Sequence, residues 1–472
     1  MELVQIGSPG VGPRVGGDVR ELRATEKLAL AAVATGVLLL AFAYFAPGKL
    51  STRLPGWAGI AATFGLVMAG GSAYWWLSYK DTIWGIKNHG VFHSSVMARK
   101  AGGWTLGFLI TAFYVLLYWH AASLEGLIRL LDPLAVLLSG KPADQWFLYG
   151  FAYTGSVLVM GLRMAMKYRH NNYQLIRTAS VAFFQLAFAF VLPQVLKGMN
   201  QPDFYFTYFW PLKPDYLLPF DYVIGDSGIA AKQWGGFAVG RAMLLWGAMM
   251  SLVAVPALTY FFGKRWYCSW VCGCGGLAET LGDPWRHLSD KSEGAWRFER
   301  ISIHAVLVFI VGFTALLWIN QATDKAILGD DGSGIFWKTY GFLIVMAFSG
   351  VIGVGFYPIM GSRVWCRFGC PQAAILGIIQ RFYSRFRITT NGGQCISCGN
   401  CSTYCEMGID VRAYAQKGEN IVRASCVGCG VCAAVCPRGV LKLENGPVGD
   451  RYINDGRVFV ALGDALRGRP RD

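Results

Sequence analysis

"CISCGNCSTYCEMGIDVRAYAQKGENIVRASCVGCGVCAAVCPRG", residues 395–439, decides the fold of the C-terminal part of the chain. It holds eight of the 13 cysteines, as two copies of the spacing C-x2-C-x2-C-x3-C that start 31 residues apart. A tight C-x2-C-x2-C loop wraps three corners of a cubane, and the fourth cysteine of each copy reaches the other copy's cluster. The spacing predicts two 4Fe-4S clusters, on Cys395, Cys398, Cys401 and Cys436 and on Cys426, Cys429, Cys432 and Cys405.

Two other uses of clustered cysteines fit this segment less well. Disulfides are disfavoured in a reducing cytoplasm. Zinc sites usually take two separated C-x2-C pairs, whereas here three cysteines fall within seven residues. One position departs from the pattern, because Glu406 follows Cys405 where Pro437 follows Cys436 in the second copy. We expect this change to affect the shape of the first loop and not its ligands.

The rest of the chain has the composition of a membrane protein. Of 472 residues, 54% are hydrophobic and 15% charged, against roughly 25% charged in a soluble domain. The apolar runs reach the roughly 20 residues that cross a bilayer as helix, and they lack the period-2 alternation of barrel strands. We therefore expect eight membrane-spanning helices, at about residues 28–46, 57–79, 103–121, 146–166, 177–196, 236–262, 301–319 and 336–360.

Lys and Arg predict the orientation of these helices. They are concentrated in alternate connecting segments and in the tail beyond residue 362, and cytoplasmic loops carry that excess. An even number of spans then places both termini and the cysteine segment in the cytoplasm, with the chain in the bacterial inner (cytoplasmic) membrane. The net charge of +15 suits an anionic lipid surface, and no nucleic-acid-reading motif accompanies it. The expected partners are the lipid bilayer and a membrane or soluble redox protein, with no nucleic acid.

A second pair of cysteine motifs lies where the sixth and eighth predicted spans end. "RWYCSWVCG" at 265–273 matches "RVWCRFGCP" at 363–371, each with an arginine, an aromatic residue and C-x3-C. On a helix, positions i and i+4 share one face, so each motif is expected to present two thiols side by side. The thiols concerned are those of Cys268, Cys272, Cys366 and Cys370.

Three interpretations of these four cysteines remain open: ligands of a further cluster, redox dithiols, or small apolar fillers. Their repetition at equivalent membrane depth argues against fillers, and spacing alone does not separate the other two. Cys274 is a spare thiol, for which two interpretations stay open: a substitute ligand or no role. The nearby cations have two possible roles. They lower the pKa of the thiols or offset the negative charge of a thiolate-ligated cluster, or they anchor the chain at the inner leaflet. These cations are Lys264, Arg265, Arg363 and Arg367.

The predicted bundle offers few other chemical groups. Arg163 and Arg241 lie near span ends, where we expect their side chains to snorkel to the interface. The aromatic outer loop at 200–228 suits an interfacial lid, with a quinone entrance or a docking surface as the alternative. The catalytic residues stay unknown.

On these motifs the chain resembles the membrane polyferredoxins of the NapH, NosR and CcoG type. The resemblance covers about residues 177–445 and departs at Gly273, which stands where those proteins have proline after the cysteine. It implies a helix bundle with a cytoplasmic double-cluster ferredoxin module. It also implies electron transfer between the quinone pool, or another membrane donor, and a redox partner. In CcoG-like proteins it implies metal reduction during oxidase assembly.

The predicted fold is an all-α polytopic membrane bundle with a small C-terminal α+β ferredoxin domain. Its parts are a leader (1–27), a first four-helix membrane region (28–176), a second one (177–362), a juxtamembrane C-x3-C-P helix (363–390), the ferredoxin domain (391–445) and a basic tail (446–472). The predicted function is electron relay between a membrane donor or acceptor, with quinone the first choice, and a redox partner, in the manner of a quinol-linked oxidoreductase subunit. The alternative is an assembly or maturation factor that reduces a metal or thiol of a client respiratory enzyme.

Overall fold

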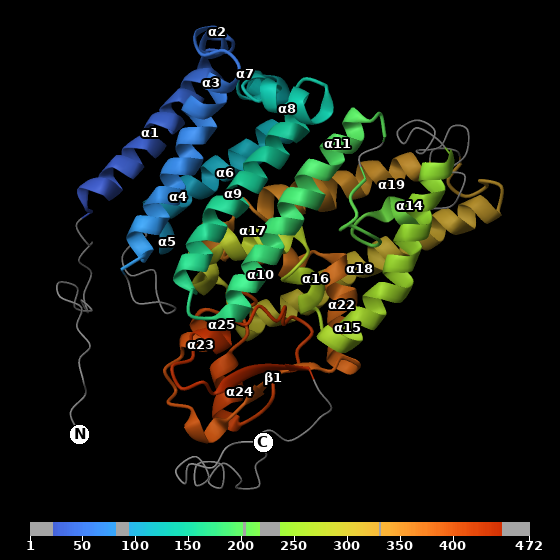
Figure 1. Cartoon of the computed structure of the whole chain (residues 1–472). Helices are drawn as coiled ribbons and strands as arrows, with labels where there is room; N and C mark the ends of the chain where they lie inside the picture. Colours follow the sequence, from blue (N-terminus) through green and yellow to red (C-terminus); the bar gives the residue numbers. More distant parts are fainter. Residues whose placement is uncertain (1–21, 82–93, 202–203, 218–236, 330–331, 446–472) are drawn as a thin grey trace.

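The computed structural model describes residues 22–81, 94–201, 204–217, 237–329 and 332–445. The predicted outer loop at 200–228 falls partly outside these ranges, as does the side chain of Arg241. The described chain is a bundle of long helices with a small ferredoxin segment at one end (Figure 1).

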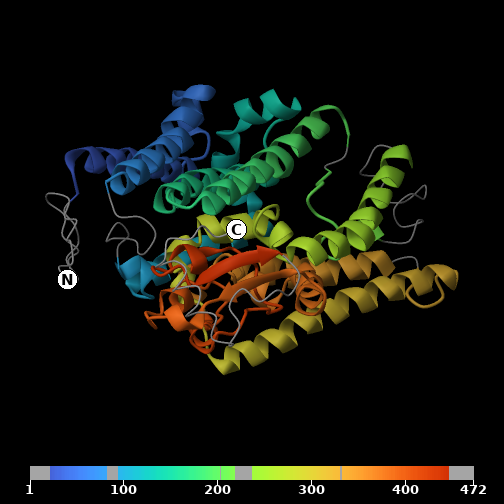
Figure 2. The same ribbon diagram turned by 60° about the horizontal axis from the view of Figure 1, so that its bottom comes forward.

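In the first half of the chain, α4 packs between α1 and α9, and α9 packs against α10 (Figure 2). In chain order its helices are α1 (Ala24–Phe45), α2 (Lys49–Arg53), α3 (Trp57–Ile60), η1 (Ala61–Gly65), α4 (Leu66–Tyr79), α5 (Ser94–Met97), α6 (Ala101–Trp119), η2 (Ala121–Leu124), α7 (Glu125–Arg129), α8 (Asp132–Ser139), α9 (Gln145–Lys167), α10 (Asn172–Phe183), η3 (Phe184–Val191) and α11 (Leu192–Gly198).

The second half of the chain contains the other long helices and all 13 cysteines. Its helices before the ferredoxin segment are η4 (Pro214–Leu217), α14 (Phe237–Met249), η5 (Met250–Ala254), α15 (Val255–Phe262), α16 (Arg265–Cys268), α17 (Gly273–Thr280), η6 (Asp283–Leu288), α18 (Glu293–Ala322), α19 (Gly332–Tyr340), η7 (Gly341–Ile352), α20 (Tyr357–Met360), α21 (Val364–Phe368) and α22 (Pro371–Phe382). Helix α6 of the first half packs against η7 and α20, so the two halves are interleaved.

Seven of the eight predicted spans are helices long and apolar enough to cross a membrane, within the part of the chain that the structure describes. The eighth, predicted at 146–166, is helix α9 of 23 residues, which is not among the seven. It carries more polar side chains than its neighbours and buries several of them, including Arg163. The last predicted span, 336–360, leaves its helix after Ile352, because the chain turns there before α20 begins at Tyr357.

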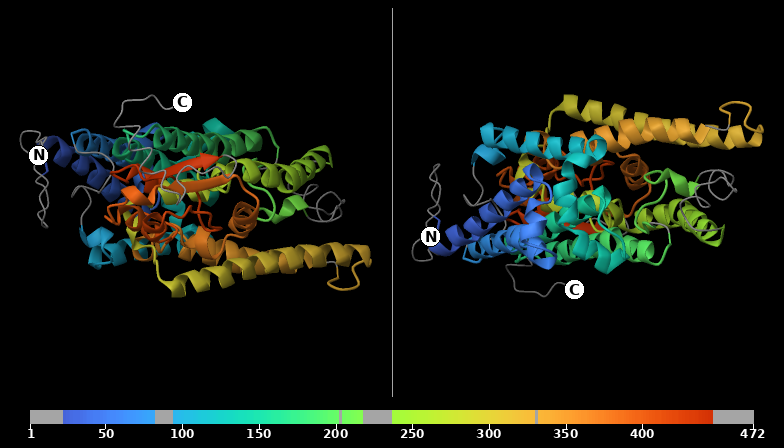
Figure 3. Two further views of the ribbon diagram at one scale, coloured as in Figure 1. Left: turned by 90° about the horizontal axis from the view of Figure 1, so that it is seen from below. Right: turned by 90° about the horizontal axis from the view of Figure 1, so that it is seen from above.

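The ferredoxin segment packs beneath the ends of the helices, below the centre of the bundle (Figure 3). Strand β1 (Phe386–Thr390) pairs antiparallel with β2 (Leu441–Asn445), and η8 (Gly392–Gln394), α23 (Asn400–Thr403), α24 (Val411–Lys417) and α25 (Val431–Ala434) lie between them. All five side chains of β1 are buried. The sheet therefore begins before the domain start predicted at residue 391.

Candidate iron–sulfur sites

The two cysteine loops of the ferredoxin segment follow the same backbone path. Ser397 and Gly399 have positive φ angles of 58° and 77°, and Gly428 and Gly430, at the equivalent positions, have 61° and 74°. Left-handed backbone at two alternate residues folds each C-x2-C-x2-C run into a tight loop, and glycine adopts it without a steric cost. The repeat in the sequence is therefore also a repeat in the backbone.

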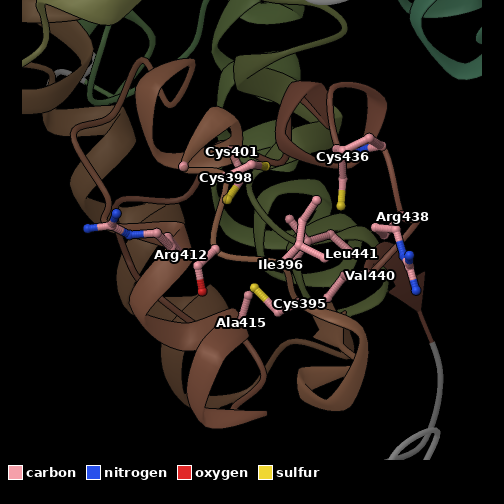
Figure 4. Close-up of a pocket in the computed structure, with 13 residues that line it drawn as sticks. Cys395, Ile396, Cys398, Cys401, Arg412, Ala415, Cys436, Arg438, Val440 and Leu441 are labelled. Atoms are coloured by element: carbon pink, nitrogen blue, oxygen red, sulfur yellow. The ribbon is translucent and has the colours of Figure 1, made fainter. Parts of the chain in front are cut away.

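The first cavity is lined by the four sulfur-bearing residues of the first predicted quartet, whose thiols face a shared space (Figure 4). They are Cys395, Cys398, Cys401 and Cys436. Arg412 and Arg438 also line this cavity. Cys398 is exposed, and the neighbouring Ile396 keeps 58% of its surface exposed. This site therefore lies at the outer surface of the ferredoxin segment.

The second cavity lies on the side of the segment that faces the helices. The second predicted quartet lines it: Cys405, Cys426, Cys429 and Cys432. Burial raises the pKa of the Cys426 thiol to about 11 and that of Cys429 to about 12. Because the thiolate and not the thiol ligates a metal, these sulfurs suit a site in which bound iron supplies the compensating positive charge.

Each fourth cysteine thus lies in the cavity of the other copy, as the spacing predicted. Four sulfur donors around one cavity, three of them on a single loop, suit a 4Fe-4S cluster better than two separate zinc knuckles. That these cysteines ligate iron stays a prediction.

Polar side chains from three helix regions hold the second loop against the bundle, and each donates a hydrogen bond to a backbone carbonyl of the loop. These bonds run from Tyr173 Oη to Gly428 O (2.9 Å), Gln174 Nε2 to Cys429 O (2.8 Å), Ser269 Oγ to Val427 O (2.8 Å) and Gln380 Nε2 to Cys426 O (2.7 Å). The second cavity is therefore fixed to the membrane region, and the first is left facing outward.

The juxtamembrane C-x3-C motifs do not form single helices, so the expected placement of each cysteine pair at i and i+4 of one helix is wrong, although the two thiols of each motif are close enough to interact electrostatically. Cys268 ends α16, and Cys366 lies in α21. The second cysteines, Cys272 and Cys370, are extended N-cap residues of the next helices, α17 and α22. The predicted helix at 363–390 is accordingly two helices followed by β1.

The four juxtamembrane cysteines nevertheless gather in one place, and all of them are buried. The Cys370 thiol interacts electrostatically with the thiols of Cys366, Cys268 and Cys272. Burial raises the pKa of Cys268 to about 12, whereas a hydrogen bond with Cys274 lowers that of Cys272 to about 7. The spare cysteine, Cys274, thus contacts this group through Cys272, and its use as a substitute ligand stays a prediction.

The cations around these motifs are mostly paired inside the protein, so inner-leaflet anchoring is wrong for three of the four. Arg363 is 1% exposed and Lys264 is 1% exposed, with Nζ of Lys264 donating to the carbonyl of Ala424 at 3.2 Å. Arg367 pairs with Glu299 at 2.7 Å. The fourth, Arg265, stacks its guanidinium over the ring of Phe386 in β1.

Arg163 does not snorkel, contrary to expectation. Its guanidinium is fully buried and pairs with Asp283, a carboxylate that also pairs with Lys167 and Arg286. Neither Asp283 nor the buried Glu279 is predictable from the sequence, because neither residue lies in a recognisable motif.

Known families match three segments of the chain. Residues 394–441 match the 4Fe-4S dicluster domain, and residues 244–292 and 341–389 match a 4Fe-4S binding domain. The latter two segments contain the two juxtamembrane motifs. No solved structure matches the chain.

Two curated proteins are similar to part of the chain. It is 30% identical over 170 residues, 35% of its length, to the putative electron transport protein YccM of Escherichia coli (strain K12). It is 26% identical over 165 residues, 34% of its length, to the methylamine utilization ferredoxin-type protein MauN of Methylobacillus flagellatus. The chain spans about half the length of these relatives, 47% and 56% respectively. These matches confirm that the chain carries 4Fe-4S ferredoxin domains and that it resembles the membrane polyferredoxins.

Proposed function

We propose that this chain is a multi-pass inner-membrane protein that relays single electrons between a donor or acceptor in the membrane and a redox partner. One observation carries the proposal: eight cysteines line two cavities, one packed against the helices and one at the outer surface. A 4Fe-4S cluster held in each cavity would accept and donate one electron at a time. Quinone is the membrane donor or acceptor that the resemblance favours.

The two cysteine quartets have different positions in this relay. Cys405, Cys426, Cys429 and Cys432 hold the inner site, close to the bundle. Cys395, Cys398, Cys401 and Cys436 hold the outer site, which a partner reaches at Cys398. Arg412 and Arg438 flank the outer site and favour a partner with an acidic surface.

We further propose that Cys268, Cys272, Cys366 and Cys370 ligate an additional juxtamembrane centre. Their burial in one group and the match of both motifs to a 4Fe-4S binding family support this role over that of apolar fillers. The redox-dithiol alternative predicts the same burial, so the two are separated by iron content.

The first experiment counts iron and acid-labile sulfide in anaerobically purified protein, with EPR of the reduced sample. Eight irons per chain are expected from two clusters, and twelve if the juxtamembrane cysteines also bind one. Cys398→Ser is expected to alter the outer cluster's EPR signal and Cys429→Ser the inner one's. Iron-free wild-type protein would overturn the proposal.

A second experiment separates the relay from the maturation factor. Chemically reduced protein in detergent is mixed with a water-soluble quinone analogue or with a cupric salt. The relay function predicts reoxidation by the quinone analogue. Clusters that do not react with quinone but reduce cupric ion would favour the maturation factor.

A further inference from the structure

Glu406 occupies the place where the second motif has Pro437, and its side chain points into the protein. It is 1% exposed, and it directly follows Cys405, a predicted ligand of the inner cluster. Its two carboxylate oxygens form ion pairs with Nη1 of Arg286 at 2.8 Å and with Nη2 of Arg363 at 3.0 Å. Both arginines belong to the membrane half of the chain. The substitution of proline by glutamate therefore creates a charged joint between the ferredoxin segment and that half.

Arg363 continues this joint to both juxtamembrane motifs. Its Nη1 atom donates to the carbonyl of Cys268 at 3.2 Å and lies 3.6 Å from the Sγ of Cys366. Its Nη2 atom also donates to Glu279 at 2.7 Å. One guanidinium thus touches a residue of each C-x3-C motif and the residue next to Cys405.

The Glu406 carboxylate is also close to a predicted inner-cluster ligand. One of its oxygens, a Glu279 oxygen and the Sγ of Cys429 all lie within 4.8 Å of one another. Arg177, Arg286 and Arg363 already pair with the two carboxylates, so we assign this group to ion pairing and not to a separate cation. The arrangement places a buried negative charge beside the inner site.

We propose that Glu406 is a positioning residue that fixes the inner cluster site onto the juxtamembrane cysteines and sets its reduction potential. This inference rests on the proposed function. A buried anion favours the oxidised form of a nearby centre, because reduction adds negative charge, and cluster potentials respond to such charge. Glu406 therefore lowers the potential of the inner site more than that of the outer site.

The test uses the full-length protein with Glu406→Gln, which keeps the shape of the side chain and removes its charge. Two quantities are measured: the potentials of the two clusters by EPR-monitored redox titration, and the rate of tryptic cleavage at the exposed Arg381 in the last turn of α22. The variant is expected to raise the potential of the inner cluster by about 59 mV, a tenfold change in the oxidised-to-reduced ratio of a one-electron centre, and that of the outer cluster by less. It is also expected to be cleaved faster.

Two further variants serve as controls. Glu419→Gln removes an exposed carboxylate from the same segment and is expected to change neither quantity. Glu406→Asp retains the charge and is expected to restore the potential to near the wild-type value.

Wild-type potentials and wild-type cleavage in Glu406→Gln would overturn the inference. Equal loss of iron in Glu406→Gln and Glu406→Asp would also overturn it, because the side chain would then be needed for its packing and not for its charge. The proposed function fails separately, if the wild-type protein contains no iron. In that case the cleavage rates still test the joint.

Discussion

At the scale of single residues, several charged side chains are buried and paired with one another. Asp283 is 1% exposed and pairs with Arg163, Lys167 and Arg286, which come from two distant parts of the chain. Removing one partner from a buried ion pair leaves an uncompensated charge in a medium of low dielectric constant. This carboxylate therefore holds α9 to the segment that follows the first C-x3-C motif.

We expect Asp283→Asn to lower the free energy of unfolding by about 3–5 kcal/mol, because three buried cations lose their shared anion. The matched control is Asp81→Asn at the solvent-exposed pair with Arg23, where a far smaller change is expected because water screens both charges. Thermal unfolding in detergent, followed by tryptophan fluorescence, measures both. Similar effects of the two variants would contradict this account of the buried network.

The sequence predicted single residues well where the signal was local. The cysteine spacing grouped the sulfurs that line each cavity, because three of the four lie on one short loop whose geometry the spacing determines. Arg163 was misplaced because its partner Asp283 lies 120 residues away, and hydropathy near a span end does not distinguish snorkelling from pairing. Glu406 was noticed as an exception, yet its partners Arg286 and Arg363 are visible only in the fold.

At the scale of elements, the two ferredoxin loops share a backbone path but differ in their surroundings. A side chain at Gly399 would meet no atom closer than 3.9 Å, whereas one at Gly430 would lie 2.8 Å from the ring of Tyr173 in α10. For the C-x3-C motifs, helical periodicity predicts the wrong secondary structure. Their spacing fits one helical face, but Cys272 and Cys370 are N-cap residues of new helices.

We expect Gly430→Ala to loosen the second loop from α10, because the methyl group collides with Tyr173 at a backbone position that already disfavours alanine. Gly399→Ala is the matched control, since φ is similar there and only the left-handed strain of about 1–2 kcal/mol applies. The inner cluster's EPR signal should broaden or disappear in the first variant and persist in the second. Equal behaviour of the two variants would show that contact with α10 does not support the loop.

At the scale of the whole molecule, the proposed relay places the binding surface for a redox partner at the outer site. Arg412 and Arg438 line this site, and the described lining of its cavity contains no acidic residue. We expect Arg412→Glu combined with Arg438→Glu to slow electron exchange with an acidic acceptor protein by about tenfold or more at low salt. The difference should shrink at high salt, where exposed charges are screened. Lys417→Glu, at an exposed position on the same segment, should have a smaller effect, and a salt-independent rate would argue against charge-guided binding.

The topology of the whole molecule depends on α9. This helix is the one predicted span that is not among the seven described helices long and apolar enough to cross a membrane. At the start of α9, its N-cap residue Asp144 pairs with Lys197 at the end of α11. At the other end of α9, Lys167 lies over the ring of Tyr404 in the ferredoxin segment. A helix of 23 residues is about 34 Å long, enough for a hydrocarbon core of about 30 Å. We therefore expect α9 to cross, which makes eight crossings and puts both ends of the chain on one side.

Reporter fusions after residue 445 and before residue 24 test this topology in intact cells. A fluorescent protein that folds only in the cytoplasm should be bright at both positions, and a periplasmic phosphatase should be inactive at both. Opposite results at the two ends would mean that α9 does not cross. Agreement at both ends with a periplasmic location would leave the eight crossings intact. It would instead overturn the orientation that the excess of Lys and Arg predicts.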